Sequence, residues 1–240
     1  MYNIHVTASD ENGRVSASFQ ESTKVVAWDL RPSVNPNLTD LIWGGTNGAD
    51  SYYFLPGLVL VQMENSVFIA SPQMVLTGTY SGRLYAYGQG GADLLLADVA
   101  TIPVSLSGGA GDDVLVGGRF SDSLDGGDGN DILFGGSLNT DLGDLLLGGA
   151  GDDVLVGWYG ADSLHGGAGD DLIIGGTLSF SNIATAIFAI QAEWTSGRSY
   201  EDRIANLTGV GVGPRNNQNF FLIPGVTAVD DAAADQLFGE

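Results

Sequence analysis

The stretch Gly108-Gly109-Ala110-Gly111-Asp112-Asp113-Val114-Leu115-Val116 decides the fold class of this chain. It follows the pattern G-G-x-G-x-D-x-U-x, in which U is a large apolar residue. Full copies return at Gly126 to Phe134, Gly148 to Val156 and Gly166 to Ile174, and weaker copies between them keep the aspartate and the apolar residue. Because most copies begin nine residues after the previous one, residues 88–176 form a tandem array.

Each copy predicts a tight turn followed by a short strand. The glycines allow positive φ and a close approach of the backbone in the turn. The strand that follows points its middle side chain inward. That middle residue is apolar along the array: Leu95, Leu115, Leu124, Leu133, Leu146, Leu155, Leu164 and Ile173. We expect these side chains to stack into one apolar ladder.

The order of the copies predicts two rows of turns. A coil of strand, turn, strand and turn uses two copies, so copies two apart in sequence stack on the same side. One side carries Asp93, Asp113, Asp131, Asp153 and Asp171, all in copies that keep the fourth-position glycine. The other side carries Asp122, Asp144 and Asp162, and two of its copies have Phe120 or Leu142 in place of that glycine. We therefore expect one regular row and one imperfect row.

The charge of the chain restricts its partners. Asp and Glu number 29 against 8 Lys and Arg, a formal net charge of −21, which repels nucleic acids and anionic membrane surfaces. Aspartates that recur at one motif position favour a hard cation such as Ca²⁺, which binds carboxylate and carbonyl oxygens. The chain has no cysteine, so disulfides and thiolate metal sites are excluded, and no apolar run is long enough to insert across a bilayer.

The nonapeptide resembles the repeat of RTX (haemolysin-type) proteins, whose arrays are calcium-binding β-rolls. The resemblance implies a mainly β fold: a right-handed parallel β-roll or β-solenoid with irregular N-terminal coils and a C-terminal helical segment packed on one sheet. It also implies that each Ca²⁺ lies between stacked turns, with about four ions in the regular row and two or fewer in the other. The implied ligands are carbonyls within Gly108, Ala110, Asp112, Gly126, Asp128, Asn130, Gly148, Ala150, Asp152, Gly166, Ala168 and Asp170, and the carboxylates of Asp93, Asp113, Asp131, Asp153, Asp171, Asp122, Asp144 and Asp162.

Turns and loops that contain glycine and proline divide the chain into segments. Similarity to RTX proteins further implies an extracellular or cell-surface parent protein, although Met1 to Asp10 lacks the charged start and apolar core of a signal peptide. The expected units are an N-terminal hairpin and linker at 1–43, which resembles the remnant of an immunoglobulin-like module, irregular capping β coils at 44–87, the β-roll at 88–176, and C-terminal helices with a β-strand cap at 177–240.

The strands of the regular side are apolar on both faces, so something must cover that sheet. Helical spacing within Ser181 to Ser196 predicts a helix that lies across it, with Ile183, Ile187, Ile190 and Trp194 facing inward. A second helix is expected from Ser199 to about Asn206, and a strand at Phe220 to Ile223. If the first helix leaves Val116, Phe134, Val156 and Ile174 open, a second copy of the chain would cover them and the protein would be a homo-oligomer.

Two functions from different classes fit the sequence. The preferred one is a calcium-binding structural module of an extracellular protein, with calcium-dependent folding. The alternative is a divalent-metal-dependent hydrolase of neutral esters or phosphotriesters, in which an incompletely ligated ion at the imperfect row or at the insertion Ser137 to Asp141 activates water. The sequence has no nucleophile elbow or zinc-protease motif, and its two histidines, His5 and His165, lie far apart. No catalytic residue can be named, which favours the structural module.

Overall fold

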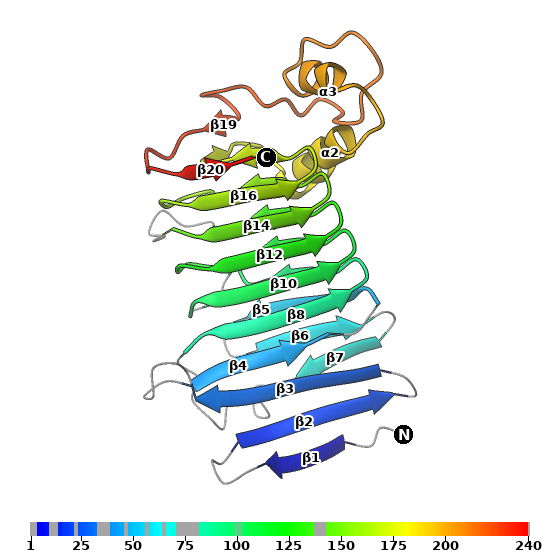
Figure 1. Ribbon diagram of the computed structural model, residues 1–240, viewed down its shortest axis with the longest axis vertical. Helices are drawn as coiled ribbons and strands as arrows, with labels where there is room; N and C mark the ends of the chain where they lie inside the picture. Colours follow the sequence, from blue (N-terminus) through cyan, green and yellow to red (C-terminus); the bar gives the residue numbers. More distant parts are fainter. Residues whose placement is uncertain are drawn as a thin grey trace.

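The computed structural model is a stack of coils in which two long β-sheets face each other and a helical segment covers one end (Figure 1). Side chains are described for residues 44–45, 48–51, 82–98, 100, 102–136 and 143–239. The backbone is described for residues 4–9, 14–21, 24–32, 39–45, 48–55, 58–63, 66–70, 82–98, 100, 102–136 and 143–239. The insertion at Ser137 to Asp141 therefore lies outside the described residues.

The first sheet has ten strands in the order β1-β2-β3-β4-β8-β10-β12-β14-β16-β20. They are β1 (Ile4–Ser9), β2 (Arg14–Glu21), β3 (Lys24–Pro32), β4 (Thr39–Gly44), β8 (Leu84–Gly90), β10 (Val104–Ala110), β12 (Ser123–Asp128), β14 (Leu145–Ala150), β16 (Ser163–Ala168) and β20 (Gln236–Phe238). Neighbours run parallel from β4 to β20 and antiparallel from β1 to β4. The predicted hairpin at the N-terminus is therefore present as β1 and β2.

The second sheet has eight strands in the order β17-β15-β13-β11-β9-β5-β6-β7. They are β5 (Asp50–Leu55), β6 (Leu58–Met63), β7 (Ser66–Ala70), β9 (Leu94–Leu96), β11 (Val114–Val116), β13 (Ile132–Phe134), β15 (Val154–Val156) and β17 (Leu172–Ile174). Pairing is parallel from β17 to β5 and antiparallel from β5 to β7. Parallel pairing of the coil type therefore begins upstream of the nonapeptides, at β4 and β5.

Copies two apart in sequence pair in register, as their order predicts. Leu95, Leu115, Leu133 and Leu155 stack in the second sheet. Leu106, Leu124, Leu146 and Leu164 stack in the first. All eight side chains are at most 1% exposed, whereas Ile173, at the end of its row, is half-buried. The predicted apolar ladder is thus the core between the two sheets and holds the turns in register.

The helix α2 (Ile183–Trp194) covers the apolar outer face of the second sheet, as its sequence predicts. Its first turn is capped by Asn182, whose side-chain oxygen accepts a hydrogen bond from Thr185 N–H at 3.0 Å. A buried cluster joins the helix to β13 and β15: Ile132, Val154, Val156, Leu178, Ile187, Ile190, Trp194 and Leu207. Each fully buried large apolar side chain contributes about 1.5–3 kcal/mol, so the helix and the sheet stabilise each other.

The cover does not reach the whole sheet. Val156 is fully buried, and Phe134 and Ile174 pack against the cluster. Val116 lies beyond the helix and lines an open groove with Leu94 and Leu96 of β9. The expectation that one helix covers all four of the predicted apolar positions is therefore wrong at Val116.

The second predicted helix is α3 (Tyr200–Leu207), capped by Ser199. The strand predicted at Phe220 to Ile223 is wrong, because that segment is irregular. Leu222 N–H donates to the carbonyl of Leu207 at 2.8 Å, and the side chains of Phe220 and Leu222 pack against the α2 cluster. A short apolar run resembles a strand in sequence, but here its side chains serve helix packing. The chain then returns to the coils through the antiparallel pair β18 (Thr177–Leu178) and β19 (Ala228–Val229) and through β20.

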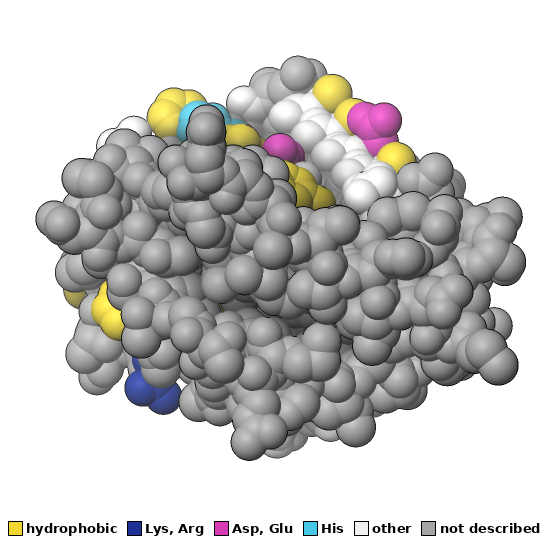
Figure 2. Space-filling view, turned by 90° about the horizontal axis from the view of Figure 1, so that it is seen from below, with side chains coloured by type: hydrophobic (Ala, Val, Ile, Leu, Met, Phe, Trp, Pro, Cys, Tyr) yellow, Lys and Arg dark blue, Asp and Glu magenta, His cyan; other side chains and the backbone are white. Residues whose placement is uncertain are grey.

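The surface view shows a few charged side chains among the described residues. Seen from the end that holds β1, the described surface carries acidic side chains at one rim and basic side chains at the opposite rim (Figure 2). None of the helices in the described part of the chain has the length and apolar character needed to cross a membrane.

Candidate metal sites

The sixth-position aspartates of the regular side form a ladder through the turns. Asp93 N–H donates to Asp113 Oδ1 at 2.7 Å, and Asp113 N–H donates to Asp131 Oδ1 at 2.8 Å. The same bond joins Asp131 to Asp153 at 2.8 Å and Asp153 to Asp171 at 3.0 Å. Each carboxylate is therefore oriented by the backbone of the preceding coil, and the structure brings the predicted row together.

The other carboxylate oxygen of these residues faces a first-position glycine. Oδ2 of Asp93, Asp113, Asp131 and Asp153 has no hydrogen-bond partner, although these residues are at most 2% exposed. A Cβ on Gly108 would lie 2.1 Å from Asp113 Oδ2 and 2.8 Å from the carbonyl oxygen of Gly126 in the next coil. The missing side chain of the glycine thus leaves a small space that two oxygens from successive coils line.

The imperfect row has the same ladder. Val104 N–H donates to Asp122 Oδ1 at 2.7 Å. In the same way, Asp122 N–H donates to Asp144 Oδ1 at 2.7 Å, and Asp144 N–H donates to Asp162 Oδ1 at 2.8 Å. A Cβ on Gly135 would meet Asp144 Oδ2 at 2.4 Å and the Gly157 carbonyl oxygen at 2.6 Å. Asp122 departs from the pattern, because its Oδ2 accepts a hydrogen bond from Gly118 N–H at 2.5 Å. The loss of regularity in sequence thus corresponds to a carboxylate that the backbone already engages.

The carbonyl groups implied as ligands fall into three kinds. Those of Gly108, Gly126, Gly148 and Gly166 line the spaces just described. Those of Ala110, Asp128, Ala150 and Ala168 accept a hydrogen bond from the fourth-position N–H of the preceding coil, at 2.7 to 2.8 Å. At the fifth position, the Asn130 carbonyl accepts from Gln191 Nε2 at 2.7 Å and the Asp170 carbonyl from Trp194 Nε1 at 2.6 Å. The first-position carbonyl oxygens are therefore the ones that line the candidate spaces.

The fifth-position side chains lie at the surface and form a second ladder. Asp112 Oδ1 accepts from Asn130 N–H at 2.8 Å, Asn130 Oδ1 from Asp152 N–H at 2.9 Å, and Asp152 Oδ1 from Asp170 N–H at 3.0 Å. Arg203 of α3 ends this ladder by donating to the Asp170 carboxylate. These side chains therefore join neighbouring turns along the outside of the stack.

Two aspartates extend the rows and were not among the predicted ligands. Asp50 N–H donates to Asp93 Oδ1 at 2.6 Å, which adds a turn before the regular row. Asp162 N–H donates to Asp235 Oδ1 at 3.0 Å, which adds a turn after the other row. Both have a sequence signal, G-x-D at Gly48-Ala49-Asp50 and the repeat-like Ala234 to Gly239, but their neighbours in the stack are 43 and 73 residues away.

Burial raises the pKa of the carboxyl groups in the regular row. The pKa of Asp131 rises to about 8, mainly through burial, with the Asp113 N–H opposing the shift and neighbouring carboxylates adding to it. Burial likewise raises the pKa of Asp93 to about 8, of Asp153 to about 7 and of Asp113 to about 6. Ionising the stacked carboxyl groups is therefore costly unless a cation compensates their charge.

Calcium fits these turns by donor type. The atoms that face each space are carboxylate and carbonyl oxygens, which Ca²⁺ prefers. Within the described ranges, no three acidic or histidine side chains are grouped so that they could hold a metal on their own. Most ligands must therefore come from the backbone, which explains why each turn needs glycines and supplies one inward carboxylate.

His165 packs on the C-terminal strand of the stack. Its ring is stacked on Phe238 with centroids 4.3 Å apart, and its Nε2 lies 3.0 Å from Ser163 Oγ. This ring is half-buried and contributes to the packing of β20 on β16.

Comparison with known proteins identifies the repeat. The family model described as RTX calcium-binding nonapeptide repeat (4 copies) matches residues 107–142 and 138–173. Searches of curated proteins and of solved structures found no significant match. The matched residues hold most of the aspartates of the two ladders, whereas Asp50, Asp93 and Asp235 lie outside them. The chain therefore contains RTX calcium-binding nonapeptide repeats at residues 107–173.

Proposed function

We propose that this chain folds when calcium binds and then serves as a rigid spacing and folding element of a larger extracellular or cell-surface protein. The observation that carries the proposal is the row of buried Oδ2 atoms on Asp93, Asp113, Asp131 and Asp153 that lack a protein partner. A metal ion that ligates them replaces the lost hydration. Because such sites do not exist in the unfolded chain, the free energy of calcium binding becomes free energy of folding.

The two ladders support a proposal for the number of ions. Six aspartates from Asp50 to Asp171 leave five gaps in the regular row. Four from Asp122 to Asp235 leave three in the other row. We propose one Ca²⁺ for each gap, one more in each row than the sequence implies. The gap after Asp122 is expected to bind most weakly, because the backbone already occupies that carboxylate.

The proposed extracellular role is argued from the calcium concentration that such a module needs in order to bind. Extracellular calcium modules bind in the range of about 10⁻⁴–10⁻³ M, far above the calcium concentration that cytosolic sensors respond to. With affinities of this order, the array stays loose inside a cell and folds where calcium is abundant.

Chelation tests the proposal. Circular dichroism and thermal unfolding of the chain would be recorded with EGTA, with Ca²⁺ and with Mg²⁺ at equal concentration. We expect EGTA to lower the β signal and the Tm, Ca²⁺ to restore both, and Mg²⁺ to restore them poorly because it resists losing its water ligands. Asp131→Asn should weaken the response to Ca²⁺. A Tm and spectrum that EGTA leaves unchanged would rule calcium-dependent folding out.

A further inference from the structure

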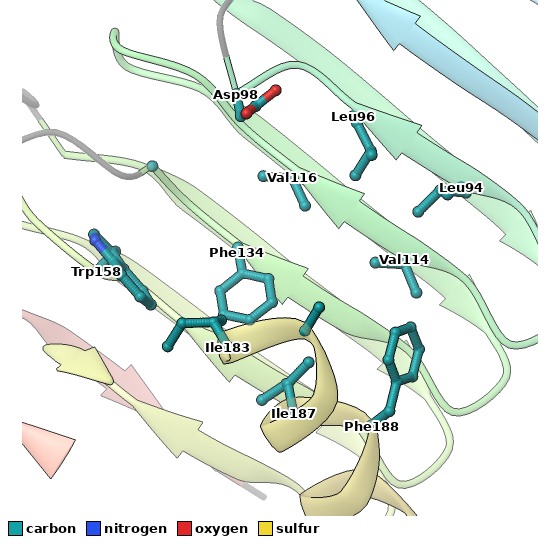
Figure 3. A pocket seen from close by; sticks show the side chains of 12 residues that line it. Leu94, Leu96, Asp98, Val114, Val116, Phe134, Trp158, Ile183, Ile187 and Phe188 are labelled. Atoms are coloured by element: carbon teal, nitrogen blue, oxygen red, sulfur yellow. The ribbon is translucent and has the colours of Figure 1, made fainter. Parts of the chain in front are cut away.

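A groove on the second sheet is lined by none of the aspartates of the two ladders. Its floor is made by Leu94 and Leu96 of β9 and by Val116 of β11, and its wall by Ala184 and Ile187 of α2 (Figure 3). The cavity is about 500 Å³. This volume is within the range of about 300–1,000 Å³ that small-molecule sites occupy. The groove is thus large enough for a ligand and lies between a β-sheet and a helix.

Aromatic side chains enclose the groove at unusual positions. Trp158 has a φ of +80°, in a place where Gly109, Gly127, Gly149 and Gly167 of the full repeats have φ between +105° and +115°. A bulky residue in this conformation is strained, and such strain gathers at functional sites. The Trp158 ring meets Phe134 edge to face, with centroids 5.9 Å apart.

Phe188 closes the opposite end of the groove from Trp158 and Asp98 (Figure 3). Its side chain is 51% exposed although it belongs to the helix that covers the sheet. A large aromatic residue left half in water beside an apolar floor marks a surface that another apolar group can bury.

The negative charge at the groove favours a ligand with a cationic group. Asp98, an exposed residue, is the one charged side chain among the described residues that line the groove. It lies at one end of the floor, past Leu96 (Figure 3). Together with the net charge of −21, it attracts a cationic head group and repels an anionic one. The same net charge disfavours a second copy of the chain as the occupant, because two strongly acidic surfaces would have to meet.

We propose that this groove binds a small amphiphile with a single hydrocarbon or aromatic body and a cationic head. The apolar body lies on Leu94, Leu96 and Val116 between Phe188 and Trp158, and the head lies beside Asp98. The site uses none of the aspartates of the two ladders, although Trp158 belongs to a turn of the imperfect row.

Calorimetric titration of the calcium-loaded protein with decylammonium, decanol and decyl sulfate, each below its aggregation concentration, tests the proposal. These probes share one chain and differ in head charge. We expect decylammonium to bind one to one and most tightly, and decyl sulfate least. Asp98→Asn should weaken decylammonium roughly two- to fivefold, the range of an exposed ion pair, and leave decanol unchanged.

Two matched variants locate the site. Ala184→Phe fills the groove from an exposed helix position and should weaken every probe by about tenfold or more. Thr185→Phe adds the same ring at the next exposed position, outside the groove lining, and should change nothing. Phe188→Ser, which removes one end of the groove, gives a second variant if Ala184→Phe perturbs the helix. One-to-one binding that survives Ala184→Phe and Phe188→Ser, equal binding of decyl sulfate, or self-association that Ala184→Phe abolishes would each overturn the proposal.

Discussion

At the scale of single residues, Gly148 shows what the first glycine of a repeat contributes. Its φ is not positive, so alanine suits the backbone there. A Cβ would nevertheless lie 2.4 Å from both Asp153 Oδ2 and the Gly166 carbonyl oxygen. We expect Gly148→Ala to remove one calcium ion from the titrated stoichiometry and to lower the free energy of unfolding of the calcium form by about 1–3 kcal/mol, as overpacking does.

Gly197→Ala is the control for this variant, because its Cβ would meet nothing within 4 Å. It should bind calcium as the parent chain does, when both are titrated by calorimetry and unfolded by urea. If Gly148→Ala bound as many ions as the control with the same affinity, the space beside Asp153 Oδ2 would not be a calcium site.

The sixth-position aspartates could be predicted from sequence because each repeats a local pattern. Asp113 and Asp131 are each flanked by their own glycines, and the stacking of copies two apart places them together. Asp50 and Asp235 could not be assigned in this way. Their neighbours in the ladders lie 43 and 73 residues away, and the segments between them do not follow the nine-residue period.

At the scale of elements, the spacing of apolar residues predicted the helix and the sheet whose apolar faces pack together. The helix α2 was evident from apolar residues three and four apart, and its target sheet from strands that are apolar on both faces. The segment Phe220 to Ile223 has no such period, and its length does not distinguish a strand from an irregular apolar run. The extent of the cover also depends on the length of α2 relative to the spacing of the strands. The helix does not extend over Val116.

Arg203 fixes the helical cap to the turns. It is 5% exposed, donates to the Trp194 carbonyl at 2.6 Å, bonds the Asp170 carboxylate, and stacks over the Trp194 ring at 4.9 Å. We expect Arg203→Met to destabilise the cap by about 1.5–3 kcal/mol, the range of hydrogen bonds to charged groups. Hydrogen exchange should quicken in α2 and α3, while the coils of residues 104–134 keep their protection.

Arg119→Met is the matched control, because it removes the same charge from an exposed turn residue of the array. Hydrogen exchange in α2 and α3 should match that of the parent chain. Equal exchange in the Arg203 and Arg119 variants would show that the apolar cluster alone holds the cap.

At the scale of the whole molecule, stacking the coils places several carboxylates close together in a buried row. One turn contributes a single inward carboxylate, but the fold aligns Asp93, Asp113, Asp131 and Asp153 in one buried row. The row forms only because two sheets of short strands keep every coil in register. Its stability must therefore depend on whether protons or calcium neutralise the carboxylates.

The metal-free chain should be more stable in acid than at neutral pH. Burial raises the pKa of the aspartates of the row from 3.8 to about 6 for Asp113, about 7 for Asp153 and about 8 for Asp131. Between these values the folded chain holds protons that the unfolded chain has lost, so stability is full below about pH 4 and falls as the pH rises through about 6 to 8. In EGTA, the urea midpoint should decrease from about pH 5 to about pH 8. With saturating calcium, protons compete with the ion and the midpoint should instead increase over this range. A midpoint in EGTA that increases with pH would show that the carboxylates of the row are ionised in the metal-free fold.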